Sequence, residues 1–200
     1  SFTVANGDQD DQTIEGAYLT KEGLDLTQLI EKFLHVSVSF SQTAQDYLGV
    51  DLGEGKGLLA DNTAAKEGKT YTALEHHFDE GFGYFGAARD YLSYTDAQVK
   101  SGLSKDSDSD GKVNMKSEKN FGISVNLAKR DVGSTTGTDL STQGMKAFLV
   151  GRHLIAEKPE GYLDAVKKIS IAIKQNWEKA LAATVVHYIN DVIEDMEKYG

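Results

Sequence analysis

The chain has 200 residues, 40% of them hydrophobic, which suits a single globular domain large enough to bury a sizeable core. Its 31 acidic and 21 basic residues give a net charge of −10 and no basic patch stands out, which argues against nucleic acid or anionic lipid as a partner and favours cations. The chain lacks cysteine, which excludes disulfides, thiolate nucleophiles and sulfur-ligated metals, and no run of 18 apolar residues predicts a membrane-spanning helix.

A single proline and the regular spacing of apolar residues predict an all-α fold. We expect a helical bundle of about five helices with long irregular loops and one EF-hand-like acidic loop. Residues 1–23 are polar and turn-rich, which predicts an irregular N-terminal arm with a short extended piece at residues 2–5. Residues 24–200 are then a single helical domain. Because the chain opens at Ser1 without a start methionine or signal peptide, we expect that an upstream segment is missing and that this domain could be the C-terminal part of a larger one.

The first predicted helix begins at Asp25, with Gln28 three residues later completing a capping box. Apolar residues then follow at helical spacing, which predicts a stripe that faces the core. The stripe consists of Leu26, Leu29, Ile30, Phe33, Leu34 and Val38. We expect this helix to end near Leu48. Residues 49–69 contain five glycines and predict a long loop with one short turn.

The second predicted helix covers residues 72–92, because Thr72 and the glutamate three residues later form another capping box. On this helix His76 and His77 both lie within one turn of Glu80. A histidine and a carboxylate one turn apart can offer a metal two ligands from a rigid element. The same spacing also occurs in helices that bind nothing.

Three glycines in the same stretch, Gly81, Gly83 and Gly86, need an explanation. Each glycine in a helix interior costs about 0.5–1 kcal/mol relative to alanine. Close packing of a neighbouring helix is one explanation. Room for a ligand beside Tyr84 and Phe85 is the other.

The acidic stretch after residue 105 has the oxygen-donor spacing of an EF-hand-type calcium loop. The predicted calcium ligands are Asp106, Asp108, Asp110, Lys112 through its carbonyl, Asn114 and Glu118. Gly111 occupies the sixth position, where the sharp turn needs glycine. Position 12 is Ser117, so the closing carboxylate comes one residue late. Either the loop is one residue longer than usual or its affinity is weak, and the alternative to a calcium site is a solvated acidic linker.

Three further helices are expected, over residues 117–129, 140–157 and 160–198. The apolar stripe of the last helix becomes polar in its C-terminal half, where His187 and Asp191 continue the spacing. A buried imidazole and carboxylate need partners. They could form an internal hydrogen-bond network or share a site with the second helix.

Several motifs together resemble a known group of proteins. They are His77-x-x-Glu80 followed by Gly-Phe-Gly-Tyr-Phe-Gly, the acidic loop leading into Ser-Glu-Lys-Asn-Phe-Gly, the stretch 126–131 and the stretch 185–191. In this order they resemble the imelysin-like exported helical proteins of bacteria, and more closely an uncharacterised lipoprotein family related to them. The imelysin pattern is Gly-x-His-x-x-Glu, and here Glu75 replaces its glycine.

The resemblance implies a helical bundle of the bacterial envelope, periplasmic or associated with the outer membrane and linked to iron uptake. It also implies a longer natural chain, which a lipid anchor at the missing N-terminus could attach to a membrane. Some members of the imelysin-like group are proposed metallopeptidases, so the resemblance leaves enzyme activity open.

The leading hypothesis is therefore a non-catalytic extracytoplasmic protein with structural Ca²⁺ in the acidic loop. A second cleft would bind a transition metal such as Fe or Zn, or a small ligand. Its predicted residues are His76, His77, Glu80, Tyr84 and His187. The rival hypothesis is a zinc-dependent imelysin-type metallopeptidase in which His77 holds the zinc.

Overall fold

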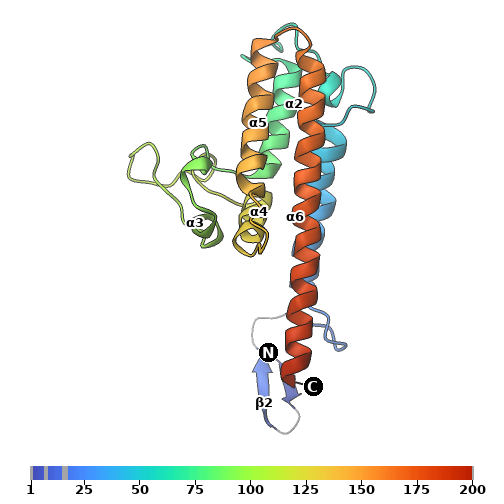
Figure 1. Cartoon of the computed structure of the whole chain (residues 1–200), viewed down its shortest axis with the longest axis vertical. Coiled ribbons are helices and arrows are strands. Elements are labelled where there is room, and N and C mark those ends of the chain that lie inside the picture. The colour runs from blue at the N-terminus through green and yellow to red at the C-terminus, as the bar shows by residue number, and fades with distance from the viewer. Residues whose placement is uncertain (1, 7–8, 15–17, 200) are drawn as a thin grey trace.

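The protein is an all-α helical bundle in a computed structural model that describes residues 2–6, 9–14 and 18–199 (Figure 1). This confirms the predicted fold class. The α-helices are α1 (Leu26–Phe33), α2 (Ala73–Phe85), α3 (Asp96–Lys100), α4 (Gly122–Val132), α5 (Leu140–Glu157) and α6 (Tyr162–Tyr199). Two π-helical segments, η1 (Leu34–Phe40) and η2 (Gln42–Tyr47), continue α1, and two short 3₁₀ turns are η3 (Gly57–Leu59) and η4 (Tyr91–Ser93). In the described part of the chain, no helix has both the length and the hydropathy needed to cross a bilayer.

Part of the N-terminal arm is more regular than expected. Strands β1 (Phe2–Asn6) and β2 (Gln9–Ile14) form an antiparallel hairpin. The register pairs Phe2 with Ile14 and Thr3 with Thr13, residue types that favour strands. The extended piece expected at residues 2–5 is therefore one strand of this hairpin, and the arm is not wholly irregular.

The core lies where α2, α5 and α6 run side by side (Figure 1). Four buried aromatic side chains meet there: Phe78 and Phe85 from α2, Phe148 from α5 and Trp177 from α6. The ring of Phe85 stacks on Phe148 and on Trp177, with centroids 5.2 and 5.9 Å apart. Aromatic rings bury large apolar areas, so this cluster is the main hydrophobic contact between the three helices.

Glycines on α5 let that helix approach the aromatic cluster closely. A Cβ atom on Gly144 would lie 3.3 Å from the ring of Phe85, and one on Gly151 would collide with the ring of Phe78. Both glycines therefore fill a packing role, because any side chain would displace a buried ring.

Helix α2 starts at the predicted capping box but ends at Phe85, seven residues before the predicted end at Leu92, with Gly86 as its C-cap. Gly86 has φ 76°, a left-handed conformation that terminates the helix. A Cβ atom there would lie 2.5 Å from the carbonyl oxygen of Phe121, whose amide donates to the carbonyl of Gly86 at 2.9 Å. The chain that leads into α4 thus packs directly on the end of α2.

The other two glycines of α2 differ from each other. Gly81 faces Leu48, which a Cβ atom would meet at 3.4 Å, whereas a Cβ atom on Gly83 would meet nothing within 4 Å. Close packing therefore requires glycine at position 86, whereas a methyl group at position 81 would make an ordinary van der Waals contact.

The first predicted helix is correct in position but wrong in burial. Asp25 caps it as expected, its carboxylate accepting from the amide of Gln28 at 3.1 Å, and helical backbone continues to Tyr47. All six residues of the predicted core-facing stripe are exposed, however, Phe33 to 67%. The reason is that α1 lies beside the C-terminal part of α6, which extends beyond α2, α4 and α5 (Figure 1). No helix among the described residues covers this face.

Three of the four α-helices after α2 overlap predicted helical stretches, with different agreement in their bounds. Helix α5 matches its predicted bounds, and α6 differs by one or two residues at each end. Helix α4 begins at Gly122 and not near Ser117, because the residues before it hold the acidic loop and the end of α2. The short helix α3 was not predicted.

The two kinds of glycine contact predict opposite effects of alanine. Gly151→Ala should lower the free energy of unfolding by about 1–3 kcal/mol, because the methyl group displaces the ring of Phe78. Gly83→Ala, the matched control, should raise it by about 0.5–1 kcal/mol through helix propensity alone. Urea unfolding curves measure both, and equal effects of the two variants would contradict the packing argument.

Candidate metal centre

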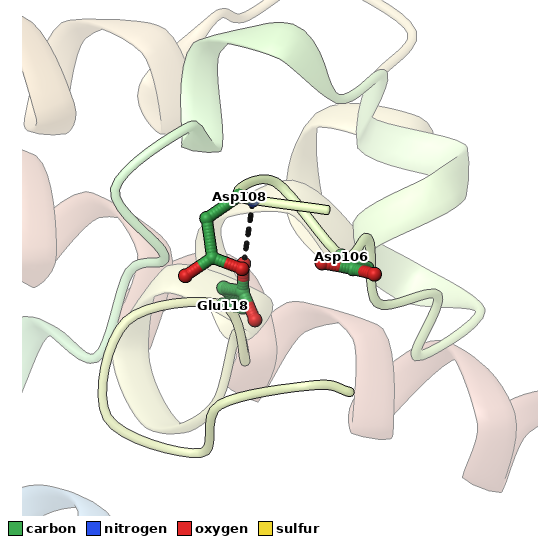
Figure 2. A group of neighbouring side chains, drawn as sticks. All are labelled: Asp106, Asp108 and Glu118. Carbon is green, nitrogen blue, oxygen red and sulfur yellow. Dashed lines mark hydrogen bonds between the residues drawn. The ribbon is translucent and has the colours of Figure 1, made fainter. Parts of the chain in front are cut away.

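The acidic loop lies between α3 and α4, at the side of the bundle (Figure 1). It brings carboxylate oxygens of Asp106, Asp108 and Glu118 within 4.8 Å of one another (Figure 2). Asp106 and Asp108 are exposed, whereas Glu118 is only 1% exposed. Within residues 2–6, 9–14 and 18–199, this is the one group of three or more histidines and carboxylates that could hold a metal ion.

Glu118 holds the two ends of the loop together through its carboxylate. Its Oε1 accepts from the amide and the hydroxyl of Ser107, both at 2.7 Å, and from the amide of Asp108 at 3.3 Å. Its Oε2 accepts from the amide of Asn114 at 2.7 Å. These donors, the Asn114 amide foremost and then the Ser107 hydroxyl, lower the pKa of Glu118 to about 2. The carboxylate is therefore charged at all ordinary pH values.

The first half of the loop has the turn expected for a calcium loop. The carboxylate of Asp106 accepts from the amide of Gly111 at 2.8 Å and from that of Asp110 at 3.1 Å. Gly111 has φ 83°, as its place in the sharp turn requires, and Ser109 has φ 62°. Asp106 is thus held with its carboxylate turned into the loop.

Asp110, the remaining predicted carboxylate, does not join the group, and the ligand roles of the Lys112 carbonyl and Asn114 stay predictions. Asp110 accepts from the amide of Lys112 at 2.8 Å, and the side chain of Asn114 accepts from the amide of Lys116 at 2.9 Å. These bonds turn both side chains toward their own backbone. The loop therefore gathers Asp106, Asp108 and the late carboxylate Glu118.

The arrangement suits a hard cation. Three carboxylate oxygens form an all-oxygen donor set without imidazole or sulfur, the type that Ca²⁺ and Mg²⁺ prefer. Oε1 of Glu118 already accepts three hydrogen bonds, whereas Oε2 accepts one and keeps a free lone pair. Because two of the carboxylates are exposed, water can complete the coordination of an ion bound there.

His77 and Glu80, the central pair of the predicted second cleft, do not pair with each other. His76 is the histidine beside Glu80, its Nε2 lying 3.4 Å from the carboxylate. His77 points elsewhere, and its Nδ1 lies 3.2 Å from the carbonyl oxygen of Gly57. Both histidines lie within one turn of Glu80, and only His76 is turned toward its carboxylate.

Of the other two predicted cleft residues, Tyr84 shares a neighbour with His77, because the ring of Tyr47 lies 6.2 Å from the His77 ring. Tyr84 stacks on Tyr47 with centroids 5.9 Å apart, and the pKa of Tyr47 is raised by burial and by nearby Glu80. His187 lies on the C-terminal half of α6, its Nδ1 3.4 Å from the carboxylate of Asp191. Both side chains of that pair are about half exposed, so the prediction of a buried imidazole and carboxylate is wrong.

Sequence reasoning missed Ser107, which donates two of the four hydrogen bonds to Glu118. It also missed Asn120, whose side chain accepts from the amide of Ala88 at 2.7 Å and ties the loop to the end of α2. The contact of Ser107 with Glu118 could have been predicted from the presence of a serine at the second position of the loop. No local sequence pattern indicates the contact of Asn120 with Ala88, because the two residues are 32 positions apart.

The low pKa of Glu118 predicts how stability depends on pH. A carboxyl group whose pKa is lower in the folded than in the unfolded state stabilises the fold above its ordinary pKa of about 4.3. That contribution should disappear as the pH falls toward 2. In chelator-treated protein, Glu118→Gln should therefore flatten the loss of melting temperature between about pH 4.5 and 2.

Glu67→Gln is the matched control, because this exposed loop glutamate makes no hydrogen bond or ion pair in the part of the chain that the structure describes. Thermal melts across this pH range measure the effect. An equal slope for wild type and Glu118→Gln would show that the hydrogen bonds of Glu118 do not stabilise the fold.

Searches of curated proteins and of solved structures find no match to the chain. A family model described as a domain of unknown function, DUF4856, matches residues 4–200. Since that match covers almost the whole chain, the protein belongs to the DUF4856 family.

Proposed function

We propose that this DUF4856 domain is a calcium-binding helical-bundle module of the bacterial envelope, with a structural and not a catalytic site. The observation that carries the proposal is the grouping of three carboxylates, from Asp106, Asp108 and Glu118, within 4.8 Å. Like charges this close repel one another unless a cation lies among them. The loop positions before Glu118 match those of a calcium loop, which supports calcium over magnesium.

The expected affinity is weak. Only three protein carboxylates converge, two of them are exposed, and the loop is already held by hydrogen bonds to Glu118. Calcium loops of extracellular modules bind with dissociation constants of about 10⁻⁴ to 10⁻³ M. A site of this strength would be filled outside the cytoplasm, which supports the envelope location that the resemblance to exported proteins implies.

The role of the ion would be to stiffen the connection between α3 and α4. Glu118 precedes α4 by four residues, and Asn120 is bonded to the end of α2. An ion bound to Asp106, Asp108 and Glu118 would therefore couple the exposed loop to the bundle. The same resemblance supports a distant relationship to the imelysin-like proteins and a lipid anchor upstream of this domain.

The geometry gives no reason to prefer a zinc metallopeptidase. A catalytic zinc site needs three protein ligands and an open position. In the described part of the chain, Glu80 has one histidine beside it, His76, and no third histidine or carboxylate joins them. We therefore restrict the proposal to the acidic loop.

Calcium titration tests the proposal. Isothermal titration calorimetry on chelator-treated protein should give one site with a dissociation constant of about 0.1–1 mM. Ten millimolar Ca²⁺ should then stabilise the fold by about 1.5–3 kcal/mol, visible as a higher melting temperature.

Asp108→Asn should abolish both the binding heat and the shift in melting temperature, because it removes one of the three converging charges. Asp46→Asn, the same change at an exposed residue of η2, should leave both unchanged. No heat of binding to the wild-type protein at 10 mM Ca²⁺ would rule out a calcium function.

The location can be tested separately. The full-length gene product, expressed in its native bacterium with a C-terminal epitope tag, should fractionate with the periplasm or the outer membrane. Its tag should be cleaved by protease in spheroplasts whose cytoplasmic marker stays intact. A tag that co-fractionates with the cytoplasmic marker and resists protease would contradict the envelope proposal.

A further inference from the structure

The C-terminal half of α6 has an uncovered apolar seam. Val186, Ile189, Ile193 and Met196 follow one another at spacings of three, four and three residues. All four are about half exposed or more, from 48% at Ile193 to 68% at Met196. Spacing that alternates between three and four is the pattern by which one helix packs lengthwise against another. Monomeric proteins rarely leave such a continuous apolar surface in water.

The outer face of α1 adds to this surface. Lys32 of α1 lies over the ring of Tyr188 of α6, its Nζ 5.7 Å from the ring centroid, so the two helices are neighbours. Leu29, Ile30 and Phe33 of α1 are each more than half exposed. Two adjacent helices with exposed apolar faces form half of a four-helix arrangement, which a second pair of helices would complete.

A basic groove runs beside the seam. It has a volume of about 1010 Å³ and lies between α4, the loop after it, α1 and the C-terminal half of α6. Its charged lining residues are Lys32, Lys100, Lys129, Arg130, Lys179 and a single carboxylate, Glu31. The groove therefore has an excess of basic residues, whereas in the whole chain acidic residues outnumber basic ones by 31 to 21.

Most cations of the groove make no ion pair within the described part of the chain. Of its five basic residues, only Lys32 makes an ion pair within the described ranges of the chain. The Nε atom of Arg130 is buried and has no hydrogen-bond acceptor there. The lysines without an ion pair give the groove an excess of positive charge, so it is suited to receive carboxylates from outside the chain.

The end of α6 carries such carboxylates. Asp191, Glu194, Asp195 and Glu197 alternate there with the residues of the apolar seam. The chain therefore has an acidic helix end that carries an apolar seam, and beside that seam it has a basic groove. The two surfaces are complementary, and both belong to the same molecule.

From this complementarity we propose that the C-terminal half of α6 pairs antiparallel with the same helix of a second copy of the chain. In a twofold arrangement, Val186 lies opposite Met196 of the second copy and Ile189 lies opposite Ile193. The seam spans 11 residues, about 15 Å of helix. The acidic end of each helix then reaches the basic groove of the other copy, near Lys129 and Arg130. Because the contact is self-complementary, it closes as a dimer.

Size-exclusion chromatography with light scattering tests the association. The wild-type chain should be a dimer at tens of micromolar. Ile193→Glu should weaken the dimer at least tenfold, because it places a charge in the seam. Ile171→Glu, at a residue of the same helix that is 53% exposed but lies outside the seam, should leave it unchanged. Circular dichroism shows whether both variants stay folded.

Charge reversal tests the groove. Lys129→Glu with Arg130→Glu should weaken the dimer at least tenfold, and so should Asp195→Lys with Glu197→Lys. All four changes in one chain should restore the dimer to within a few-fold of wild type, because reversed charges again face each other. Failure of the combined variant to recover would overturn the pairing of groove and helix end.

Cysteine cross-linking tests the direction of the helices, and the chain has no cysteine of its own. An oxidised mixture of the Ile189→Cys and Ile193→Cys variants should form mainly the mixed disulfide dimer. Predominant self-linking of each variant would indicate parallel helices and overturn the proposed register. A wild-type chain that stays monomeric would overturn the proposal entirely. Binding of the seam to phosphatidylglycerol vesicles, in a chain that forms no dimer, would also overturn it.

Discussion

The close approach of α5 to the aromatic rings of α2 is the contact on which the rest of the structure depends. Gly151 and Gly144 leave room for Phe78 and Phe85. Phe85 stacks on Phe148 and Trp177, and Phe78 meets Phe148 edge-on, so that the four rings form the buried centre of the bundle. Because this cluster fixes the position of α2, it also fixes where the end of that helix lies in the molecule. The left-handed Gly86 then receives the chain that enters α4.

The acidic loop takes its shape from that junction. Backbone hydrogen bonds at Gly86 and a side-chain bond from Asn120 hold the residues just before α4 against the end of α2. Glu118 precedes them, so its buried carboxylate has a fixed position from which to accept four hydrogen bonds from the loop. The loop is therefore partly organised by protein donors alone, and a cation would act on a site whose shape already exists.

The molecule has two unlike halves. In one, α2, α5 and α6 bury their apolar residues against each other around Trp177. In the other, α6 continues beyond the bundle beside α1, and the apolar residues of both helices face water (Figure 1). Basic residues that are scattered through an acidic sequence also come together there, in the groove around Arg130. Charge and apolar surface of this kind, concentrated at one end of a protein, are typical of a surface that binds another macromolecule.

The sequence by itself determined the local features: the all-α class, the helix starts at Asp25 and Thr72, the bounds of α5 and the turn at Gly111. Caps, periodicity and tight turns depend on residues a few positions apart, so a linear pattern is enough to predict them. Only the tertiary structure decided which stripe is buried, which histidine faces Glu80, where α2 ends and how Glu118 reaches Ser107. Each of these depends on which distant segment packs nearby, and spacing along the chain carries no information about that.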